Sequence, residues 1–336
     1  MPSIIRVTNL TKHFGDLHAV DDLSFTVERA DIYGFLGQNG AGKSTTIRML
    51  LTLIAPTGGE IEIFGMNLRT HRREILRRVG AVIERPDLYK YLTAYENLSL
   101  FARMSGIKPT SRLLMDQLEQ VGLAERAHSK VRTFSQGMKQ RLGIAVALVH
   151  NPDLVILDEP TNGLDPQGIA DIRNLILHLS NRMQKTLLIS SHLLSEMELI
   201  ATSMLIIDKG RKVAEGRVAD LFDPAQTLVE LDTADPSHTL EVIGRSEWSR
   251  CLADSGRSEA NRPASAEPAS SGPGPYPGPS SERRCLLKMN KAMIPVFTAY
   301  LVREGIQVQA IRPRHSLEDY FLSLTTANQH VEAFTD

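Results

Sequence analysis

A glycine-rich loop that ends in Gly42-Lys43-Ser44 contains the residues with the clearest chemistry. The loop fits the pattern G-x-x-x-x-G-K-[ST]. It lies between an apolar run at 32–36, which predicts a buried strand, and a run at 45–51, which predicts a helix. Glycines adopt backbone conformations that are closed to other residues, and the loop N–H groups and the helix N-terminus together form a nest for anions. The segment therefore predicts the phosphate-binding loop of an ATPase, a GTPase or a kinase.

Each position of this loop has a predicted part in holding a nucleotide and its metal ion. The Lys43 ammonium is expected to reach the β- and γ-phosphates, and the Ser44 hydroxyl is expected to ligate Mg²⁺. The predicted nucleotide-binding residues of the loop are Gly37, Asn39, Gly40, Ala41, Gly42, Lys43, Ser44 and Thr45.

Further polar groups follow two other predicted strands. The apolar run at 154–157 ends in Asp158 and Glu159, and the run at 186–191 ends in His192. Ligands of parallel sheets bind beyond the carboxyl ends of the strands, where the phosphate loop also lies. We expect Asp158 to position Mg²⁺ and Glu159 to orient or deprotonate an attacking water. The plain alternative is a pair of acidic residues at an exposed strand end.

The order of the predicted elements indicates the α/β class. Strands alternate with helices, which favours a mostly parallel sheet covered on both faces. Residues 4–28 show strand periodicity, and residues 93–150 form a helical insertion that opens with Thr93 and Glu96 at capping-box spacing. A basic stretch at 69–78 is most simply the solvated face of a helix.

A smaller α+β unit is predicted after the first, which divides the chain into domains at 1–217 and 218–336. Its predicted elements are strands at 228–231, 240–243 and 308–311, an ordered run at 285–289, and helices at 294–303 and 316–324. The segment between the predicted strand at 240–243 and the ordered run at 285–289, about 246–283, is rich in Ser, Pro, Gly and Arg. We expect this segment to be disordered or extended.

The overall composition excludes several classes of protein. A chain of 336 residues with a formal net charge of −1 has no global basic field for nucleic acid. Cys251 and Cys285 lack metal-ligand spacing, so free thiols in a reducing compartment are expected. No signal-peptide pattern is present at the start, and the longest apolar runs are too short to span a bilayer. If the protein works at a membrane, another chain must supply the span.

Taken together, the motifs resemble the nucleotide-binding subunit of an ATP-binding cassette (ABC) transporter over residues 4–216. The matching segments are the Walker A loop at 37–45, the signature at 134–141, Walker B at 154–159, the D-loop at 163–166, the switch histidine His192 and the adenine-stacking Phe14. The resemblance implies a P-loop NTPase cassette. That fold has a mixed or parallel core sheet, an antiparallel β subdomain and a helical subdomain at about 90–150, with the small C-terminal domain added. It also implies ATP and Mg²⁺ as cofactors and Glu159, His192 and Lys43 as the catalytic residues.

The resemblance also implies two kinds of protein partner. A second cassette, expected to be another copy of the chain, faces the first head to tail, so that Ser135 and Gly137 contact the γ-phosphate across the dimer. Asp165 of the D-loop is a further predicted nucleotide-binding residue. A separate multi-span permease places the protein at the cytoplasmic face of the cell membrane. We expect the permease to dock near 86–97, where Tyr89 and Tyr91 are predicted to be exposed.

Three positions depart from the usual family pattern. The signature has Gln136 and Met138 where Gly and Gln are usual, and Glu84 stands where the family usually has Gln. A carboxylate at position 84 can still bind metal, so Glu84 joins Ser44 and Asp158 as a predicted metal ligand. These positions are similar to the bacitracin-resistance and lantibiotic-immunity type of exporter ATPase, which implies a peptide antibiotic or another amphipathic compound as cargo.

Two other functions were weighed against transport. A cassette ATPase of translation or DNA repair is the first, but translation factors usually carry two cassettes in one chain, and repair clamps usually carry a long coiled coil. A phosphate-loop kinase is the second, and it does not account for the signature, the D-loop and His192.

Overall fold

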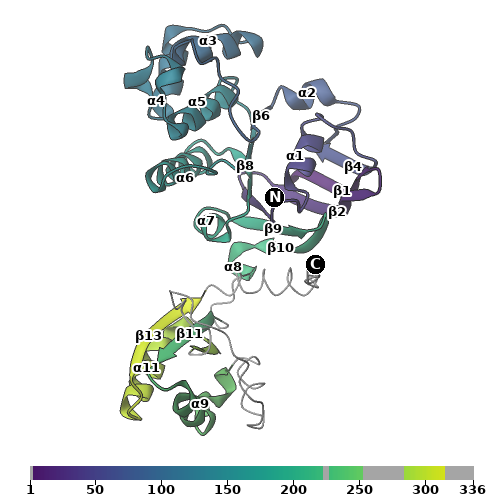
Figure 1. Cartoon of the computed structure of the whole chain (residues 1–336). Coiled ribbons are helices and arrows are strands. Elements are labelled where there is room, and N and C mark those ends of the chain that lie inside the picture. Colours follow the sequence, from purple (N-terminus) through teal and green to yellow (C-terminus); the bar gives the residue numbers. More distant parts are fainter. Residues whose placement is uncertain (1–2, 222–226, 253–283, 315–336) are drawn as a thin grey trace, which may run out of the picture. The chain divides into compact units, whose positions relative to one another are not determined.

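The computed structural model describes residues 3–221, 227–252 and 284–314, which belong to two compact units, Met1–Val218 and Ala219–Asp336 (Figure 1). Each unit is described by itself. The helix predicted at 316–324 and residues 253–283 of the predicted disordered segment lie outside the described residues. In the described ranges, no helix is long and apolar enough to cross a membrane.

A six-stranded sheet in the order β10-β9-β3-β8-β7-β6 forms the centre of the first unit. Five of its strands run parallel, and β10 pairs antiparallel with β9 at one edge. The strands are β3 (Ile32–Leu36), β6 (Val79–Val82), β7 (Leu154–Asp158), β8 (Thr186–Ser191), β9 (Ser203–Asp208) and β10 (Arg211–Arg217). Every residue of β3, β7 and β8 is buried, as continuous apolar runs predict for a sheet covered on both faces.

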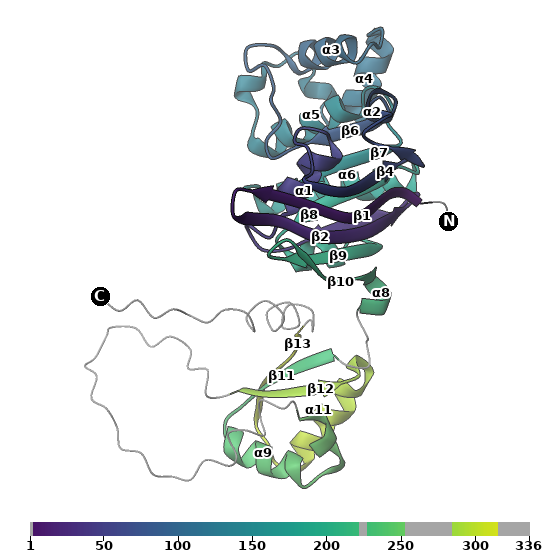
Figure 2. The same ribbon diagram turned by 90° about the vertical axis from the view of Figure 1, so that its right-hand side faces the viewer.

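An antiparallel sheet in the order β2-β1-β4-β5 packs against the central sheet across α1 (Figure 2). Its strands are β1 (Ser3–Phe14), β2 (Leu17–Glu28), β4 (Gly58–Ile63) and β5 (Met66–Asn67). Val7 and Leu23 of this sheet, Ile47 of α1 and Ile156 of the central sheet belong to one hydrophobic cluster. Burial of these alternating apolar positions is what holds the two sheets together.

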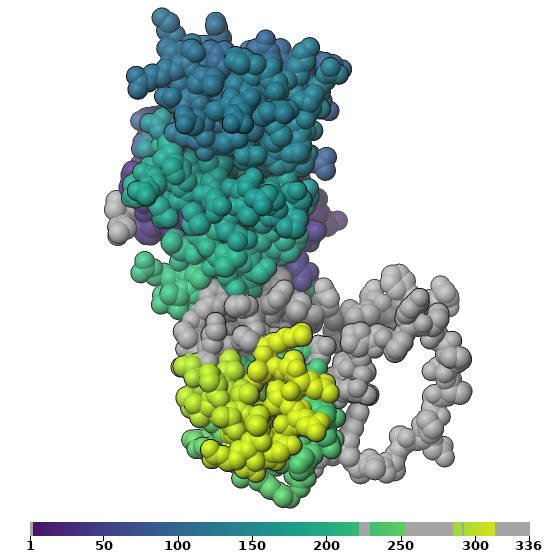
Figure 3. Space-filling model, turned by 90° about the vertical axis from the view of Figure 1, so that its left-hand side faces the viewer, coloured from purple at the N-terminus to yellow at the C-terminus, as the bar shows by residue number. Residues whose placement is uncertain are grey.

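The helices of the first unit are α1 (Lys43–Leu50), α2 (Arg72–Leu76), α3 (Ala94–Met104), α4 (Ser111–Gln120), α5 (Gln136–Leu148), α6 (Pro166–Asn181) and α7 (Leu194–Glu198), with 3₁₀ turns at Ala124–Arg126 and Val131–Thr133. Helix α8 (Val218–Leu221) follows β10. Helices α3, α4 and α5 pack together as a helical subdomain at one end of the unit (Figure 3). The capping box of Thr93 and Glu96 is confirmed at the start of α3. Helix α2 is shorter than the predicted 69–78.

The second unit is a three-stranded antiparallel sheet, β12-β11-β13, packed with short helices. Its elements are β11 (Thr227–Thr233), α9 (Pro236–Gly244), a 3₁₀ turn at Glu247–Cys251, β12 (Arg284–Met289), a 3₁₀ turn at Lys291–Met293, α11 (Ile294–Arg303) and β13 (Val308–Arg314). Val229, Leu287, Phe297 and Leu301 are fully buried in a hydrophobic cluster of its own.

One predicted strand of this unit, at 240–243, is wrong, because these residues lie in α9. The Asp235 side chain caps that helix by accepting a hydrogen bond from the His238 N–H at 3.0 Å, and Pro236 occupies its first turn. Thr239 and Ile243, four residues apart, are its buried positions. A short apolar run fits a strand or a helix equally well, and here the cap at Asp235 decided the outcome.

The predicted start of the disordered segment, at about residue 246, is also wrong. Residues 246–252 are described, and Trp248 is only 7% exposed, with its ring centroid 5.0 Å from that of Phe297. Burial of one large aromatic side chain contributes enough free energy to order the residues beside it, although their composition is polar.

Candidate functional site

The phosphate loop, the Walker B carboxylates and the switch histidine follow three adjacent strands. β3 pairs in parallel with β8, and β8 with β7, so their carboxyl ends lie at one edge of the sheet. Lys43 begins the helix after β3, Glu159 follows β7, and His192 follows β8. The sheet thus brings together residues that lie far apart in the sequence.

Glycine is required at two positions of the phosphate loop. Gly40 and Gly42 have φ angles of 83° and 105°, in the left-handed region that side chains disfavour. A Cβ atom at Gly42 would also lie 2.5 Å from the carbonyl oxygen of Ala19. Because α1 begins directly after Gly42, the N–H groups at its first turn have no helical partners and face the loop.

The Lys43 ammonium lies inside the site rather than in solvent. Its side chain is 6% exposed, and Nζ donates to the carbonyl oxygens of Gly37 at 2.6 Å and Gln38 at 3.2 Å. The same Nζ lies 3.2 Å from Oε1 of Glu159. A buried ammonium with one carboxylate partner is a strong electrostatic centre for phosphate oxygens.

Asp158 is fully buried, and its two carboxylate oxygens have different surroundings. Oδ1 accepts a hydrogen bond from the Ser190 hydroxyl at 2.5 Å, whereas Oδ2 is buried with no hydrogen-bond partner in the described structure. Mg²⁺ is commonly held by one carboxylate together with water and substrate phosphates, and an open acceptor on a buried carboxylate fits that role. The described residues contain no cluster of three His, Cys, Asp or Glu side chains that would hold a metal without phosphate.

Glu159 is held in an unusual conformation between the Lys43 ammonium and the His192 imidazole. Its φ angle is 49°, a left-handed value that is uncommon outside glycine, and its backbone N–H donates to Ser190 Oγ at 2.9 Å. Its Oε2 lies 2.8 Å from Nδ1 of His192, and its Oε1 faces Lys43. The three predicted catalytic residues thus form one contiguous chain.

The predicted signature and D-loop residues begin two neighbouring helices. The Ser135 hydroxyl accepts from the Met138 N–H at 3.2 Å at the start of α5, and Asp165 accepts from the Gly168 N–H at 3.0 Å at the start of α6. A Cβ atom at Gly137 would lie 3.7 Å from the Cα of Gly168, so these helix N-termini are adjacent. Among the described contacts, none joins Ser135 or Gly137 to the phosphate loop.

Two predicted residues lie apart from this chain of contacts. Glu84 is 62% exposed with a φ angle of 56°, and its carboxylate forms an ion pair with Arg48 of α1 rather than contacting Asp158. Phe14 ends β1 and is 49% exposed. The Lys12 ammonium lies 4.9 Å from the centroid of its ring.

Sequence reasoning missed two residues that contact the predicted site. Ser190 bonds to both Walker B residues, and Arg48 pairs with Glu84. Ser190 could have been identified from the sequence, because a polar residue inside a fully buried strand requires a hydrogen-bond partner. The contact of Arg48 could not have been predicted in this way, because an arginine on a helix next to a loop is most often only solvated.

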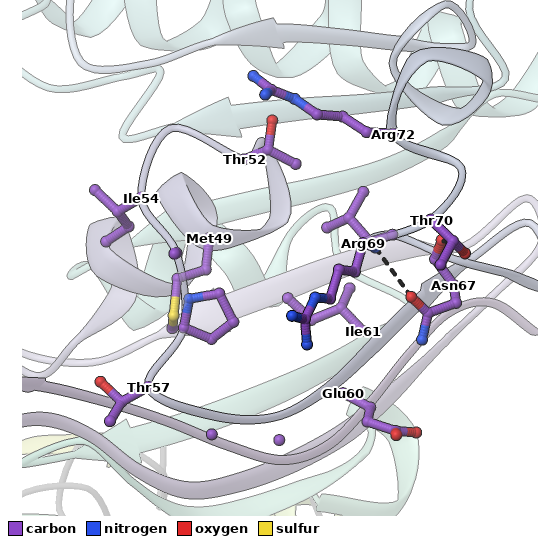
Figure 4. Close-up of a pocket in the computed structure, with 15 residues that line it drawn as sticks. Met49, Thr52, Ile54, Thr57, Glu60, Ile61, Asn67, Arg69, Thr70 and Arg72 are labelled. Carbon is purple, nitrogen blue, oxygen red and sulfur yellow. Dashed lines mark hydrogen bonds between the residues drawn. The ribbon is translucent and has the colours of Figure 1, made fainter.

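A hollow of the first unit lies elsewhere and contains none of the predicted site residues. It is lined by the end of α1, the turn at 55–59 and the segment around β5, including Met49, Thr57 and Arg69 (Figure 4). A phosphate nest made of backbone N–H groups is shallow, so the size of a hollow does not locate it.

Comparison with known proteins agrees with this geometry. The ABC transporter family model matches residues 20–162. The bacitracin transport ATP-binding protein BcrA of Bacillus licheniformis is 52% identical over 215 residues, which cover 64% of this chain and 70% of the relative. The chain belongs to the family of ABC transporter ATP-binding proteins. Members of this family bind and hydrolyse ATP, so the chain is an ABC ATPase.

Two further relatives agree with the predicted subtype and fold. The lantibiotic transport ATP-binding protein SrtF of Streptococcus pyogenes is 38% identical over 228 residues, covering 68% of this chain and 95% of the relative. The cbiO1 structure from Clostridium perfringens, part of the ABC transporter complex cbiONQ, has a TM-score of 0.61 at 24% identity and covers 73% of this chain and 95% of that chain. The resemblance to the bacitracin and lantibiotic type and the cassette fold are therefore confirmed. The alternatives without transport are not favoured.

Proposed function

We propose that this ABC ATPase powers an exporter through a separate multi-span permease, at the cytoplasmic face of the cell membrane. The names of the relatives state bacitracin and lantibiotic transport, which supports a peptide antibiotic or another amphipathic compound as the cargo. The observation that carries the proposal is the chain of contacts from Lys43 through Glu159 to His192 at one edge of the sheet.

The phosphates of ATP are proposed to enter the nest above α1. The loop N–H groups and Lys43 then bind the β- and γ-phosphates, and Phe14 stacks on the adenine. Ser44 and Asp158, with Glu84 as a further candidate, would hold Mg²⁺, which neutralises charge on the phosphates. Phosphate oxygens are better partners for Lys43 than the carbonyl oxygens of Gly37 and Gln38, because they carry charge.

Transfer of Lys43 to the phosphates frees Glu159 for catalysis. Its Oε1 loses the ammonium and becomes an acceptor for the proton of an attacking water. His192 keeps its contact with Oε2 and orients the carboxylate. The left-handed backbone of Glu159, pinned by Ser190, limits the directions in which the carboxylate can point.

A second copy of the chain is proposed to complete the site. The N-terminus of α5, with Ser135 and Gly137, presents N–H groups to the γ-phosphate of the partner cassette, and Asp165 lies beside it. ATP drives closure only if it binds the closed dimer more tightly than the open one. Closure would then move the permease, and hydrolysis would reset the cycle.

The test is ATP turnover and sedimentation of the purified chain, beside Glu159→Gln. We expect weak turnover by the wild type, and for Glu159→Gln a loss of about 100-fold or more together with a dimer that forms only with ATP. A Glu159→Gln variant that hydrolyses ATP at the wild-type rate would contradict the role of Glu159. If ATP binds and no dimer forms, either the signature needs the permease for closure or the partner is a different cassette.

The permease is proposed to dock on the segment at 86–97. Tyr89 and Tyr91 are 53% and 83% exposed, as predicted, and Tyr89 packs on Phe101 of α3. Tyr91→Asp should therefore abolish co-purification with the co-expressed permease and leave ATP binding unchanged, because the side chain contacts solvent. Unchanged co-purification would remove this segment from the interface. The control is Arg29→Asp, because Arg29 is exposed and lies outside this segment. Tyr300 would not serve, because it packs against the hydrophobic core of the second unit.

A further inference from the structure

Helix α2 and the residues before it carry an unusual density of arginine. Arg69, Arg72, Arg73 and Arg77 are all exposed, and Glu74 is the one acidic residue in the sequence from 69 to 78. From sequence alone, this stretch is most simply a solvated helix face. The structure adds three facts about its surroundings.

The first fact is that these cations lack acidic partners. Arg78 forms an ion pair with Asp153 at 2.8 Å and lies 3.9 Å from the ring centroid of Phe64. Among the described residues, none of Arg72, Arg73 and Arg77 takes part in an ion pair. Unpaired like charges on one short helix repel each other, which costs free energy unless an anion lies nearby.

The second fact is that the arginines of α2 share a hollow with the helical subdomain. Arg72, Arg73 and Arg77 line a hollow whose other wall is the end of α3, including Met104 and Ile107. Two exposed cations flank this wall in the sequence, Arg103 and Lys108. We call the three cations that line this hollow, Arg72, Arg73 and Arg77, the basic patch.

The third fact is the apolar and neutral character of the centre of the hollow. Met104 is 68% exposed, which is unusual for a large apolar side chain, and it lies beside the basic patch. Burial lowers the pKa of His150, which also lines the hollow, so this imidazole adds no charge at neutral pH. Arg72 also lines the separate hollow near β5 that Figure 4 shows. Arg69 lines that hollow too, and the two arginine side chains point in different directions there.

The chemistry of this surface suits an anionic interface with an apolar layer beneath it. The chain as a whole has a net charge of −1, so the basic patch is a local feature and not part of a general basic field. Nucleic acid is disfavoured because no Phe, Tyr or Trp side chain lines the hollow to stack on a base. An exposed methionine among arginines matches the boundary between lipid headgroups and acyl chains.

The place of the patch in the fold separates it from the proposed permease contact. Tyr89 and Tyr91 precede α3, whereas Met104 ends it, and the 11 residues of this helix span about 16 Å. The basic patch therefore lies by the opposite end of α3 from the segment proposed to dock on the permease. Figures 1 and 2 both place α2 and α3 at the same end of the first unit.

We propose that the basic patch binds anionic headgroups of the inner leaflet, with Met104 at the apolar boundary, and so holds the cassette against the membrane beside its permease. The inference rests on the proposed function, because it requires the chain to work at a membrane. Juxtamembrane basic groups gain about fivefold in membrane affinity each on anionic lipid, and salt screens this gain.

Vesicle flotation of the full purified chain tests the inference without a permease. The probes are phosphatidylcholine vesicles with and without phosphatidylglycerol. We expect binding only to the anionic vesicles, release by high salt, and a loss of about 25-fold for Arg72→Ala/Arg77→Ala because two basic groups are removed. Met104→Ser should weaken binding without changing its salt dependence.

The matched control is Arg29→Ala/Arg182→Ala, which removes the same charge from exposed arginines outside the patch. Equal flotation of the patch variant and this control would overturn the inference, as would absence of binding at low salt or tighter retention of single-stranded RNA than of vesicles. ATP turnover of the same samples keeps the two proposals distinct. Turnover without vesicle binding rejects the lipid surface alone, and binding without turnover rejects the ATPase mechanism alone.

Discussion

At the scale of single residues, one hydroxyl organises the carboxylates of the proposed hydrolytic site. Ser190 donates to Oδ1 of Asp158 and accepts from the N–H of Glu159, at 2.5 and 2.9 Å. It therefore leaves Oδ2 as the free oxygen of Asp158 and holds the left-handed backbone of Glu159. Ser190 is a positioning residue, since it acts through these two neighbours.

We predict that Ser190→Ala raises the Mg²⁺ concentration needed for nucleotide binding about tenfold, because a hydrogen bond to a charged group contributes about 1.5–3 kcal/mol. ATP affinity without Mg²⁺ should not change. Fluorescent-nucleotide titrations with and without Mg²⁺ measure both quantities.

The neighbouring Ser191 supplies the control for that measurement. Its hydroxyl is also buried, but it accepts a hydrogen bond from the N–H of Leu193 at 3.0 Å and contacts neither carboxylate. Ser191→Ala should leave the Mg²⁺ concentration needed for nucleotide binding at the wild-type value. Ser190→Thr, which keeps a hydroxyl at position 190, should also need only the wild-type Mg²⁺ concentration. A parallel loss in both alanine variants would mean that Ser190 acts only through general stability.

At the scale of elements, two glycines of α5 have different tasks. A Cβ atom at Gly143 would lie 2.5 Å from Cβ and Cγ of Pro86, so this glycine lets the segment after Glu84 pack on the helix. A Cβ atom at Gly137 would meet Gly168 at 3.7 Å, an ordinary contact. The first glycine serves packing, and the second is free to serve the nucleotide of a partner cassette.

We predict opposite effects for the two alanine substitutions. Gly143→Ala should lower the free energy of unfolding by about 1–3 kcal/mol, because a rigid proline ring must move. Gly137→Ala should leave stability almost unchanged and cut ATP turnover about 100-fold, because the methyl group blocks a backbone donor to phosphate. Urea unfolding and turnover separate the two effects, and a folding defect in Gly137→Ala would contradict this assignment.

At the scale of the whole molecule, each unit has its own hydrophobic core. The first contains residues of both sheets and α1, and the second surrounds Phe297 and Trp248. Trp248 is the single tryptophan of the chain, so its fluorescence reports on the second unit. Units with separate cores are expected to unfold as separate cooperative transitions.

We predict that ATP stabilises only one of these transitions. A ligand at about 100 times its dissociation constant adds about 2.7 kcal/mol to the unit that binds it. Far-ultraviolet circular dichroism of Glu159→Gln should show a transition that shifts with ATP, while the tryptophan transition stays in place. Equal shifts of both signals would show that the two units unfold as one.

The sequence alone determined the central fold and the ATPase family. Those features depend on local patterns, since a phosphate loop needs its glycines in order and a buried parallel strand needs a continuous apolar run. The bounds of α11 agree with the helix predicted at 294–303, and Pro295 lies in its first turn.

Only the tertiary structure decided which side chains meet. The contacts of Ser190 with the Asp158 carboxylate and the Glu159 N–H, and of Arg48 with Glu84, join residues 31 or more positions apart. Short apolar or polar runs, such as 240–243 and 246–252, remained ambiguous because a cap or one buried Trp248 outweighs local composition. Long-range packing sets these outcomes, and no local pattern records it.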